Sequence, residues 1–306
     1  MIWLLWRQHR LQFSLAAIAL ALFAVPMAIT GLHLADALQA CQQDNGCSGF
    51  DLLQHYNPMV VVTSVTVLVP LLVGVFWGAT IIGKELDNGT ATLVWSQSVT
   101  RRRWVRTKLI TLFVSATVTG GFVAGLVTWW SDAHNATVES RFAGLQFDIQ
   151  GVAPVGYAIF AAALGLASGV LWRRVLPAMA TTVGGFIAVR FVVELFVRSH
   201  YRTPITSTTL MSAGRGAPDG SWVMSTDLVV NGHVVSGPVQ APIECTSPAT
   251  RGSMDRCLDD IGYRLRTVYQ PSGRYWSFQW IETGIFVGLA AVLVAVAVIT
   301  LRRHDA

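Results

Sequence analysis

Six long apolar runs constrain this chain more than any other feature of its 306 residues. A helix needs about 20 apolar residues to cross the hydrocarbon core of a bilayer. The runs of this length are Leu11–Leu32, Met59–Gly83, Leu109–Ser131, Gly151–Trp172, Val175–Val197 and Thr283–Leu301. Only 13% of the residues are charged, against about 25% in a soluble domain. The sequence therefore excludes a soluble enzyme with a membrane tail and predicts an all-α polytopic membrane protein with six transmembrane helices.

The Lys and Arg residues between the runs predict the orientation, because short cytoplasmic loops carry an excess of them. With a cytoplasmic amino terminus, twelve lie inside and only Arg141 lies in a short outside loop. The segment 198–282 carries eight arginines but is placed outside, since the rule excludes loops longer than about 60 residues. We therefore expect a membrane domain at 1–197, an extracytoplasmic cap at 198–282, and a sixth helix with a cytoplasmic tail at 283–306.

The four cysteines all fall on the outside of this topology. Cys41 and Cys47 lie in the first outside loop, and Cys245 and Cys257 lie in the cap. Cysteines confined to an oxidising compartment are typical of disulfides. Of the three possible connectivities we predict the local one, Cys41–Cys47 with Cys245–Cys257, and four free thiols are the alternative.

Three local patterns add detail. Met1–Arg10, with two tryptophans followed by arginines, favours an interfacial helix on the inner leaflet, or else an extension of the first span. Asn231-Gly232 predicts a hairpin within a cap that we expect to be small and partly irregular. Gly-x-x-x-Gly pairs let helix backbones approach closely in lipid and predict a compact bundle. These pairs are Gly74/Gly78, Gly121/Gly125, Gly165/Gly169 and Gly284/Gly288.

The sequence shows no pattern of a catalytic or metal site. Gly78–Glu85 nearly fits the phosphate-binding pattern Gly-x4-Gly-Lys-Ser/Thr, but Glu85 replaces the hydroxyl that holds magnesium. The seven histidines are scattered and lack ligand spacing. We expect no catalytic residue, metal or cofactor in this chain, and no nucleic-acid partner.

The loop Lys84–Lys108 is the most informative segment. Its 25 residues exceed the usual length of a connection, which indicates a folded element with a partner. Asn88-Gly89 breaks the preceding helix, and Thr90–Gln97 can form a short one. An alternative, compatible with the first, is an anchor for anionic lipid built from Arg101–Arg103 and Arg106, each worth about 1 kcal/mol near the surface.

This loop resembles that of a known family, the membrane subunits of ATP-binding-cassette (ABC) exporters of the type-2 permease class, particularly the actinobacterial members. The loop motif that carries the resemblance is Glu85-x-x-x-Gly89-Thr90, then Leu93-x-Trp95-x-Gln97-Ser98-Val99-Thr100-Arg101-Arg102-Arg103-Trp104 and Lys108. Weaker similarities are Trp6-Arg7-Gln8-His9-Arg10 and Arg190-x-x-x-Glu194 followed by Arg198-Ser199-His200-Tyr201. The resemblance covers the whole six-helix plan.

The resemblance implies that a separate nucleotide-binding ATPase subunit docks on a coupling helix in this loop. Mg-ATP would bind in that partner, and a second copy or a homologous permease would complete a central path. The location implied is the bacterial cytoplasmic membrane, with both termini cytoplasmic. Carried over by position, the ATPase-coupling residues are Lys84, Glu85, Gly89, Thr90, Trp95, Arg101, Arg102 and Arg103. The cap is longer than in many members, so the exit gate does not carry over simply.

Arg190 and Glu194 are four residues apart in the fifth span, so on a helix they share a face. Charges within a membrane helix are costly and usually face the bundle or a water-filled cavity. We expect the pair at the translocation path or the subunit interface. The alternative is a structural ion pair, or an Arg190 that extends outward to the interface. Glu282 marks the outer end of the sixth span and is expected to be interfacial.

The leading hypothesis is therefore the permease subunit of an ABC exporter. The first alternative is a membrane receptor or signalling protein with a ligand-binding cap, which predicts that no ATPase copurifies. An intramembrane enzyme would need a convergent acid, base or metal set, and the sequence offers only Arg190 with Glu194. A secondary transporter should have ion sites in broken helices, and the sequence offers little beyond Pro26 and Pro70.

Overall fold

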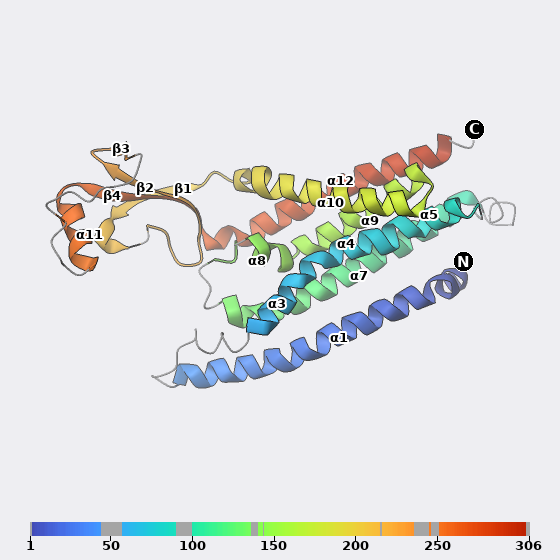
Figure 1. Ribbon diagram of the computed structural model, residues 1–306, viewed down its shortest axis with the longest axis horizontal. Coiled ribbons are helices and arrows are strands. Elements are labelled where there is room, and N and C mark those ends of the chain that lie inside the picture. Colours follow the sequence, from blue (N-terminus) through green and yellow to red (C-terminus); the bar gives the residue numbers. More distant parts are fainter. Residues whose placement is uncertain are drawn as a thin grey trace. The chain divides into compact units, whose positions relative to one another are not determined.

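The computed structural model describes residues 2–43, 57–89, 100–135, 140–142, 144–214, 216–235, 245 and 251–303. The chain divides into two compact units, the first mostly helical (Figure 1). Unit 1 comprises Met1–Thr137, Gly144–Ser199 and Ser277–Ala306, and unit 2 comprises Val138–Ala143 and His200–Trp276.

The helices that build unit 1 follow chain order, and two of them, η4 and α12, cross the division. They are α1 (Ile2–Gln43), α3 (Asn57–Val65), η1 (Thr66–Leu68), α4 (Val69–Val73), η2 (Gly74–Gly78), α5 (Ala79–Asp87), α7 (Arg101–Asn135), α8 (Gly144–Ile149), α9 (Ala153–Trp172), α10 (Val175–Val192), η3 (Val193–Val197), η4 (Arg198–His200) and α12 (Tyr275–Arg303). Of the short elements, η2 and η3 are π-helical turns, and η1 and η4 are 3-10 turns.

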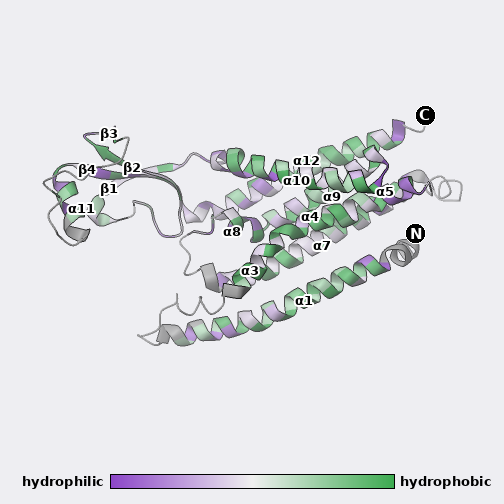
Figure 2. Ribbon diagram, viewed as in Figure 1, coloured by the Kyte–Doolittle hydropathy of each residue, from purple (hydrophilic) through white to green (hydrophobic). Residues whose placement is uncertain are grey.

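Six helices in the described part of the chain are long and apolar enough to cross a membrane. They run Arg10–Ala37, Met59–Asp87, Arg102–Asp132, Ala153–Trp172, Val175–His200 and Ser272–Arg303. Each overlaps one predicted run, so the six-span prediction is confirmed. Figure 2 shows hydrophobic residues along all of these helices, as expected where the surrounding medium is lipid.

The second span, Met59–Asp87, is assembled from the five pieces α3 to α5 rather than from one regular helix. Pro70 lies at the start of α4, where its missing N–H leaves no helical hydrogen bond unmade. The π-helical turn η2 coincides with the predicted pair Gly74 and Gly78. The irregular backbone therefore lies where this span meets α9.

Helix α9 is the centre of unit 1, because most of its residues are buried, whereas fewer than half are buried in each of the other five spans. A Cβ added at Gly74 would lie 2.6 Å from the Ala161 carbonyl oxygen, and one at Gly165 would lie 2.2 Å from the Gly74 oxygen. The two helices therefore touch backbone to backbone, as small residues permit. This confirms the packing role of the pairs Gly74/Gly78 and Gly165/Gly169.

The other two glycine pairs differ. A Cβ at Gly125, Gly284 or Gly288 would meet no atom within 4 Å, and one at Gly121 would only reach a Val155 methyl at 4.0 Å. Two of the four predicted pairs thus serve no close contact within the described chain.

Helix α1 runs without a break from Ile2 to Gln43, so a separate interfacial helix at Met1–Arg10 is not confirmed. It contacts α7 through Met27 and Leu34, which are fully buried, and through a hydrogen bond from Trp130 Nε1 to Thr30 Oγ1 of 3.2 Å. The predicted Cys41–Cys47 bond falls on Cys47 and on the side chain of Cys41, which lie outside what the structure describes.

Unit 2 contains a four-stranded antiparallel sheet in the order β1-β4-β2-β3. Its elements are β1 (Ile205–Leu210), η5 (Met211–Ala213), β2 (Trp222–Val230), β3 (His233–Val234), α11 (Arg251–Asp260), β4 (Tyr263–Gln270) and η7 (Ser272–Arg274). The all-α prediction is therefore wrong for the cap, because β1 and β4, far apart in sequence, pair along their whole length.

The hairpin prediction is confirmed. Val230 pairs with His233, and the two residues between them, Asn231 and Gly232, have φ of +51° and +83°. A two-residue type I′ turn requires positive φ at both positions, which Asn-Gly supplies at least cost. The Asn-Gly dipeptide alone was therefore sufficient to predict this hairpin.

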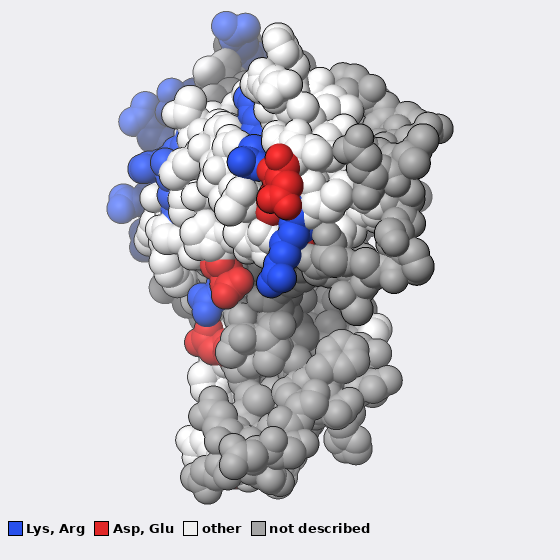
Figure 3. Space-filling view, turned by 90° about the vertical axis from the view of Figure 1, so that its left-hand side faces the viewer, with Lys and Arg blue, Asp and Glu red and all other residues white. Residues whose placement is uncertain are grey.

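The predicted Cys245–Cys257 disulfide is present and attaches the chain before α11 to that helix. Asp259 of α11 accepts hydrogen bonds from the amides of Met211 (2.6 Å) and Ser212 (3.0 Å) and so fixes η5. Figure 3 shows one face of the molecule, on which Lys and Arg side chains lie close to Asp and Glu side chains. Within unit 2, Asp259 Oδ1 lies 3.8 Å from Arg264 Nη1.

The backbone contact between the second span and α9 can be tested with one methyl group. Gly165→Ala should lower the free energy of unfolding by about 1–3 kcal/mol or more, because the Cβ meets backbone atoms that cannot move away. Thermal unfolding of the detergent-purified chain is the measurement. Gly284→Ala is the matched control, since its Cβ points into open space and Ala favours a helix. Equal transition temperatures for the two variants would contradict the assigned packing.

Candidate functional site

Five buried polar side chains meet at the end of unit 1 where α9 begins. We call Asp148, Tyr157, Arg190, Arg198 and Glu282 the charge cluster. Asp148 is contributed by the short helix α8, which follows the long helix α7 and packs against α9. The remaining members come from α9, α10, η4 and α12. Five elements of the chain are therefore joined at this point.

Asp148 is held by two arginines. Arg190 Nη2 donates to its Oδ2 at 2.5 Å, and Arg198 Nη2 donates to its Oδ1 at 2.6 Å. The exposed fractions of the three side chains are 4% for Asp148, 10% for Arg190 and 2% for Arg198. These are charge-assisted bonds shielded from solvent.

Glu282 is the second carboxylate that binds Arg198. Arg198 donates to it through Nε at 2.9 Å and Nη2 at 2.8 Å, a bidentate pair. The Tyr157 hydroxyl lies 2.6 Å from Glu282 and 3.2 Å from Asp148. Glu282 is only 1% exposed, so its carboxylate is shielded within the cluster, which the sequence did not predict.

The cluster contains two guanidinium groups and two carboxylates, so its formal charge is zero. The Arg190 guanidinium lies over the Tyr157 ring at 3.9 Å, and that of Arg198 lies over the Phe147 ring at 4.3 Å. Breaking such a buried pair on one side leaves an uncompensated charge, which is far more costly than removing both partners. The cluster is therefore stable only as a set.

Gln279 of α12 positions the segment between α8 and α9. Its Oε1 accepts the amides of Val152 (3.1 Å) and Ala153 (2.7 Å), which otherwise lack partners at a helix start. Its Nε2 donates to the Phe147 carbonyl at 2.9 Å. Gly151 has φ of +71°, and a Cβ there would lie 2.8 Å from Gln279, so this turn requires glycine.

At the other end of α7, a second buried ion pair joins the helices that flank residues 90–99. Lys108 Nζ of α7 lies 2.6 Å from Glu85 Oε1 of α5 and donates to the Ile81 carbonyl at 2.6 Å. The Trp104 ring lies 4.9 Å from the same ammonium group. We call Ile81–Asp87 together with Trp104–Lys108 the loop base.

Two backbone features complete the loop base. Asp87 Oδ2 accepts the amide of Val175 at 3.3 Å and so connects the end of α5 to the start of α10. Gly89 has φ of +66°, a conformation that glycine adopts without strain. The chain therefore leaves α5 in a direction that this glycine sets.

The predicted coupling residues have different environments. Lys84, Gly89, Arg102 and Arg103 are exposed, whereas Glu85 is 7% exposed and paired with Lys108. Thr90 and Trp95, the predicted coupling helix, and the side chain of Arg101 lie outside the described residues. Glu85 is therefore part of the loop base rather than a surface contact.

Arg190 does not pair with the residue that its sequence spacing suggested. Among the described ion pairs its partner is Asp148, not the residue four positions on, Glu194. The Glu194 carboxylate lies beside Gly144: a Cβ added to Gly144 would lie 2.7 Å from Glu194 Oε1. It also belongs to the π-helical turn η3, in which the usual i, i+4 spacing does not hold.

Asp148 and Tyr157 are the members of the cluster that the sequence analysis did not single out. Asp148 lies in the segment Leu145–Gln150, outside the predicted spans and with a glutamine on either side of Phe147-Asp148-Ile149, so no local signal marks it as buried. Which arginine would pair with it could not be read from spacing, since Arg190 and Arg198 are 42 and 50 residues away.

Comparison with known proteins identifies the family. Residues 15–198 match the model of the family described as ABC-2 membrane transporter related, and this match covers more than half of the chain. The chain belongs to this family. No curated protein and no solved structure matches it.

The ABC-2 family and the six spans make this chain a multi-pass membrane subunit of an ABC transporter. Such subunits carry out transport, and the family implies an ATP-binding partner in general. The match includes the loop base and every member of the charge cluster except Glu282. Among the described residues, no three His, Cys, Asp or Glu side chains group as metal ligands.

The charge cluster can be tested by neutralising one member. Asp148→Asn should lower the free energy of unfolding by about 3–5 kcal/mol, because it leaves a buried Arg190 without its anion. The double variant Asp148→Asn/Arg190→Gln should recover part of that loss. Thermal unfolding in detergent measures both.

Asp36→Asn is the matched control for this experiment. Asp36 is an exposed carboxylate on α1, and its neutralisation should change the free energy of unfolding by about 0.5 kcal/mol or less. Additive losses in the double variant would contradict a coupled cluster.

Proposed function

We propose that this chain is the permease subunit of an ABC exporter. A separate nucleotide-binding subunit would dock on residues 90–99 and would bind and hydrolyse Mg-ATP in its own site. The family match carries the proposal, because ABC-2 permeases work with an ATP-binding partner. The chain itself would bind no cofactor and contribute no catalytic residue. Thr90 and Trp95 are the proposed contacts of a coupling helix.

The loop base suits the transmission of force. Because Lys108 is bonded to both Glu85 and the Ile81 carbonyl, a push on the loop moves α5 and α7 together. A Cβ on Gly83 would lie 3.4 Å from the Gly169 Cα, so α9 cannot remain in place when α5 moves towards it. The second span and α9 then move as one body.

In this proposal the charge cluster is the closure at the far end of the path. It attaches α8, η4 and α12 to α9 through Asp148, Arg198 and Glu282. Substrate release would require some of these bonds to exchange partners. Glu194, half-buried in η3, is the candidate for contact with a second permease, identical or homologous.

Charge distribution supports a cytoplasmic loop end in a bacterial cytoplasmic membrane. The exposed basic residues at that end are Lys84, Arg102, Arg103, Arg106, Arg173, Arg174, Arg302 and Arg303. Short cytoplasmic segments carry such an excess. Arg101–Arg103 would then lie at the inner lipid surface, and both termini would be cytoplasmic.

The first experiment is copurification. The chain is expressed with the ATPase encoded beside its gene and purified through a tag on this chain, and Mg-ATP hydrolysis is assayed. A stable complex that hydrolyses ATP is expected. Gly89→Pro should reduce the bound ATPase by about tenfold, equivalent to 1.4 kcal/mol, because proline fixes φ near −65° where the chain requires +66°.

Gly214→Pro is the matched control, since Gly214 also has positive φ (+78°) and open space around it but lies in unit 2. It should retain the ATPase. A chain that purifies without any ATPase would sink the proposal and favour the receptor alternative, in which the cap binds a ligand.

Substitutions at Lys84 and Glu85, which are adjacent in the sequence, distinguish a role in docking the ATPase from a role in stabilising the loop base. Glu85→Ala should lower the free energy of unfolding by about 3–5 kcal/mol and impair ATPase stimulation, because it leaves Lys108 buried without a counter-charge. Lys84→Ala should reduce stimulation with a change in stability of about 0.5 kcal/mol or less, as for other exposed positions. Thermal unfolding and ATPase assays on both variants test this. Unchanged stability in Glu85→Ala would refute the assignment of Glu85 to the loop base.

A further inference from the structure

Among the described residues, Glu194 is a carboxylate that makes no ion pair although it lies in a membrane-spanning segment. It is half-buried in η3, within the span Val175–His200. The described ion pairs of unit 1 use the carboxylates of Glu85, Asp148 and Glu282. A charge within a span is costly unless a counter-charge reaches it. Glu194 is therefore a candidate partner for a cation that is bound to another carboxylate in this structure.

The π-helical turn explains why Arg190 and Glu194 are not paired. In a regular α-helix, residues four apart share a face. The amide of Arg198 instead bonds to the carbonyl of Val193, five residues back, which adds about one residue to this turn. Two α-helical turns take about 7 residues, so with this addition the eight residues from Arg190 to Arg198 make about two turns. Both arginines therefore face Asp148.

The carboxylates of Asp148 and Glu194 lie along the same face of α8. A Cβ added to Gly144 would lie 2.7 Å from Glu194 Oε1, and Gly144 precedes Asp148 by four residues in α8. Residues four apart on a helix share a face and are separated by about 6 Å along its axis. The carboxylate of Glu194 therefore lies about one helical turn of α8 from the carboxylate that now binds Arg190.

Transfer of Arg190 from Asp148 to Glu194 would leave no charge without a partner. Asp148 would keep its bond to Arg198 Nη2 at 2.6 Å. Arg198 would also keep its bidentate pair with Glu282. The change would lie in what Arg190 joins, because a bond between α10 and α8 would become a bond between neighbouring turns of one helix. The transfer would therefore release α8 from α10.

We propose that η3 is a switch between two ion pairs of Arg190. In the state that the structure shows, the π-helical turn directs Arg190 to Asp148 and so joins α10 to α8. In the second state the backbone from Arg190 to Glu194 is regular α-helix, Arg190 pairs with Glu194, and α8 is free to move. The role of this switch rests on the proposed function, in which it opens the far end of the path. The Val175 amide at the start of α10 is bonded to Asp87 of the loop base, so movement of the loop base would reach α10 directly.

A double-mutant cycle on the purified full chain tests the exchange, with thermal unfolding in detergent as the measurement. In the native chain Glu194→Gln should leave the transition temperature unchanged or raise it, because it removes a carboxylate that makes no ion pair in the described part of the chain. In the Asp148→Asn chain the same substitution should lower it by about 3 °C or more, because Glu194 is then the anion that binds Arg190. Asp36→Asn, at an exposed carboxylate of α1, is the matched control and should have the same small effect in both chains.

A deletion keeps the test decisive if Asp148→Asn does not fold. Leu195 is 61% exposed and lies in η3. Its deletion removes the additional residue of the π-helical turn and leaves Arg190 and Glu194 four residues apart. The two side chains should then pair in the resting chain, so Glu194→Gln should lower the transition temperature of the Leu195 deletion by about 3 °C or more.

The copurified complex tests the role in transport separately. Glu194→Gln should retain the bound ATPase but lower Mg-ATP hydrolysis about tenfold, equivalent to about 1.4 kcal/mol, because the second ion pair of Arg190 cannot form. Asp36→Asn should leave hydrolysis unchanged. A chain that purifies without an ATPase would refute the proposed function, whereas the thermal cycle needs no partner and would still decide the exchange.

Four outcomes would overturn the proposal. Additive effects of Glu194→Gln and Asp148→Asn would mean that Arg190 does not turn to Glu194. A lower transition temperature for Glu194→Gln in the native chain would mean that this carboxylate is already paired there. Additive effects together with loss of a dimer in Glu194→Gln, measured by size-exclusion chromatography, would assign Glu194 to contact with a second permease. Unchanged hydrolysis in the complex would show that the exchange is not a step of the transport cycle.

Discussion

The close contact between α9 and the second span is the constraint on which unit 1 depends. Glycines of the second span lie so close to α9 that an added Cβ would meet backbone atoms. The contact joins Gly74, Gly78 and Gly83 to Ala161, Ala162, Gly165 and Gly169. Lipid supplies no hydrophobic drive for helices to associate, so close packing has to hold them together. A helix packed in this way along its length has little freedom to shift at one end alone. Helix α9 therefore links the loop base to the charge cluster, because Gly169 lies near the first and Tyr157 belongs to the second.

The two buried ion networks are both electrically neutral. Lys108 with Glu85 is neutral as a pair, and the charge cluster is neutral with two arginines and two carboxylates. Each joins helices at one end of α7, which is about 52 Å long by its rise per residue. Neutral, hydrogen-bonded sets are the form in which charges persist away from water. Their placement at the helix ends leaves the middle of the bundle to small apolar side chains. A network can move without separating charges only if its helices move together or a cation exchanges one carboxylate for another.

Sequence was informative where the signal is local and uninformative where it depends on partners. Span positions follow from apolar run length, and the β2–β3 hairpin follows from Asn231-Gly232. The pairing of β1 with β4 joins segments about sixty residues apart, and β1 carries Ser or Thr on both of its faces, so no alternation of apolar and polar residues identified this strand. The i, i+4 argument for Arg190 and Glu194 assumed a regular α-helix, but Glu194 begins a π-helical turn and Arg190 reaches across to α8. Glu85 was singled out in the loop motif as a coupling residue, but its burial against Lys108 could be seen only in the tertiary structure.

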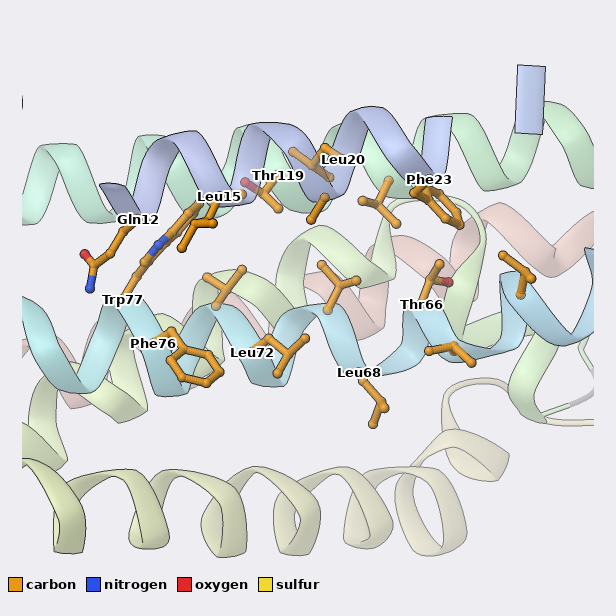
Figure 4. Close-up of a pocket in the computed structure, with 17 residues that line it drawn as sticks. Gln12, Leu15, Leu20, Phe23, Thr66, Leu68, Leu72, Phe76, Trp77 and Thr119 are labelled. Atoms are coloured by element: carbon orange, nitrogen blue, oxygen red, sulfur yellow. The ribbon is translucent and has the colours of Figure 1, made fainter. Parts of the chain in front are cut away.

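Helix α1 differs from the other spans in what holds it. It does not share the glycine contact of α9, and it packs on α7 through a few side chains such as Met27 and Leu34 near its middle. Near Gln12 it meets the second span through Phe13, whose ring centroid lies 5.8 Å from that of Trp77, and a groove lies between the two helices (Figure 4). A helix held by side chains can change its tilt when those side chains change rotamer, whereas α9 is held by backbone contact and cannot.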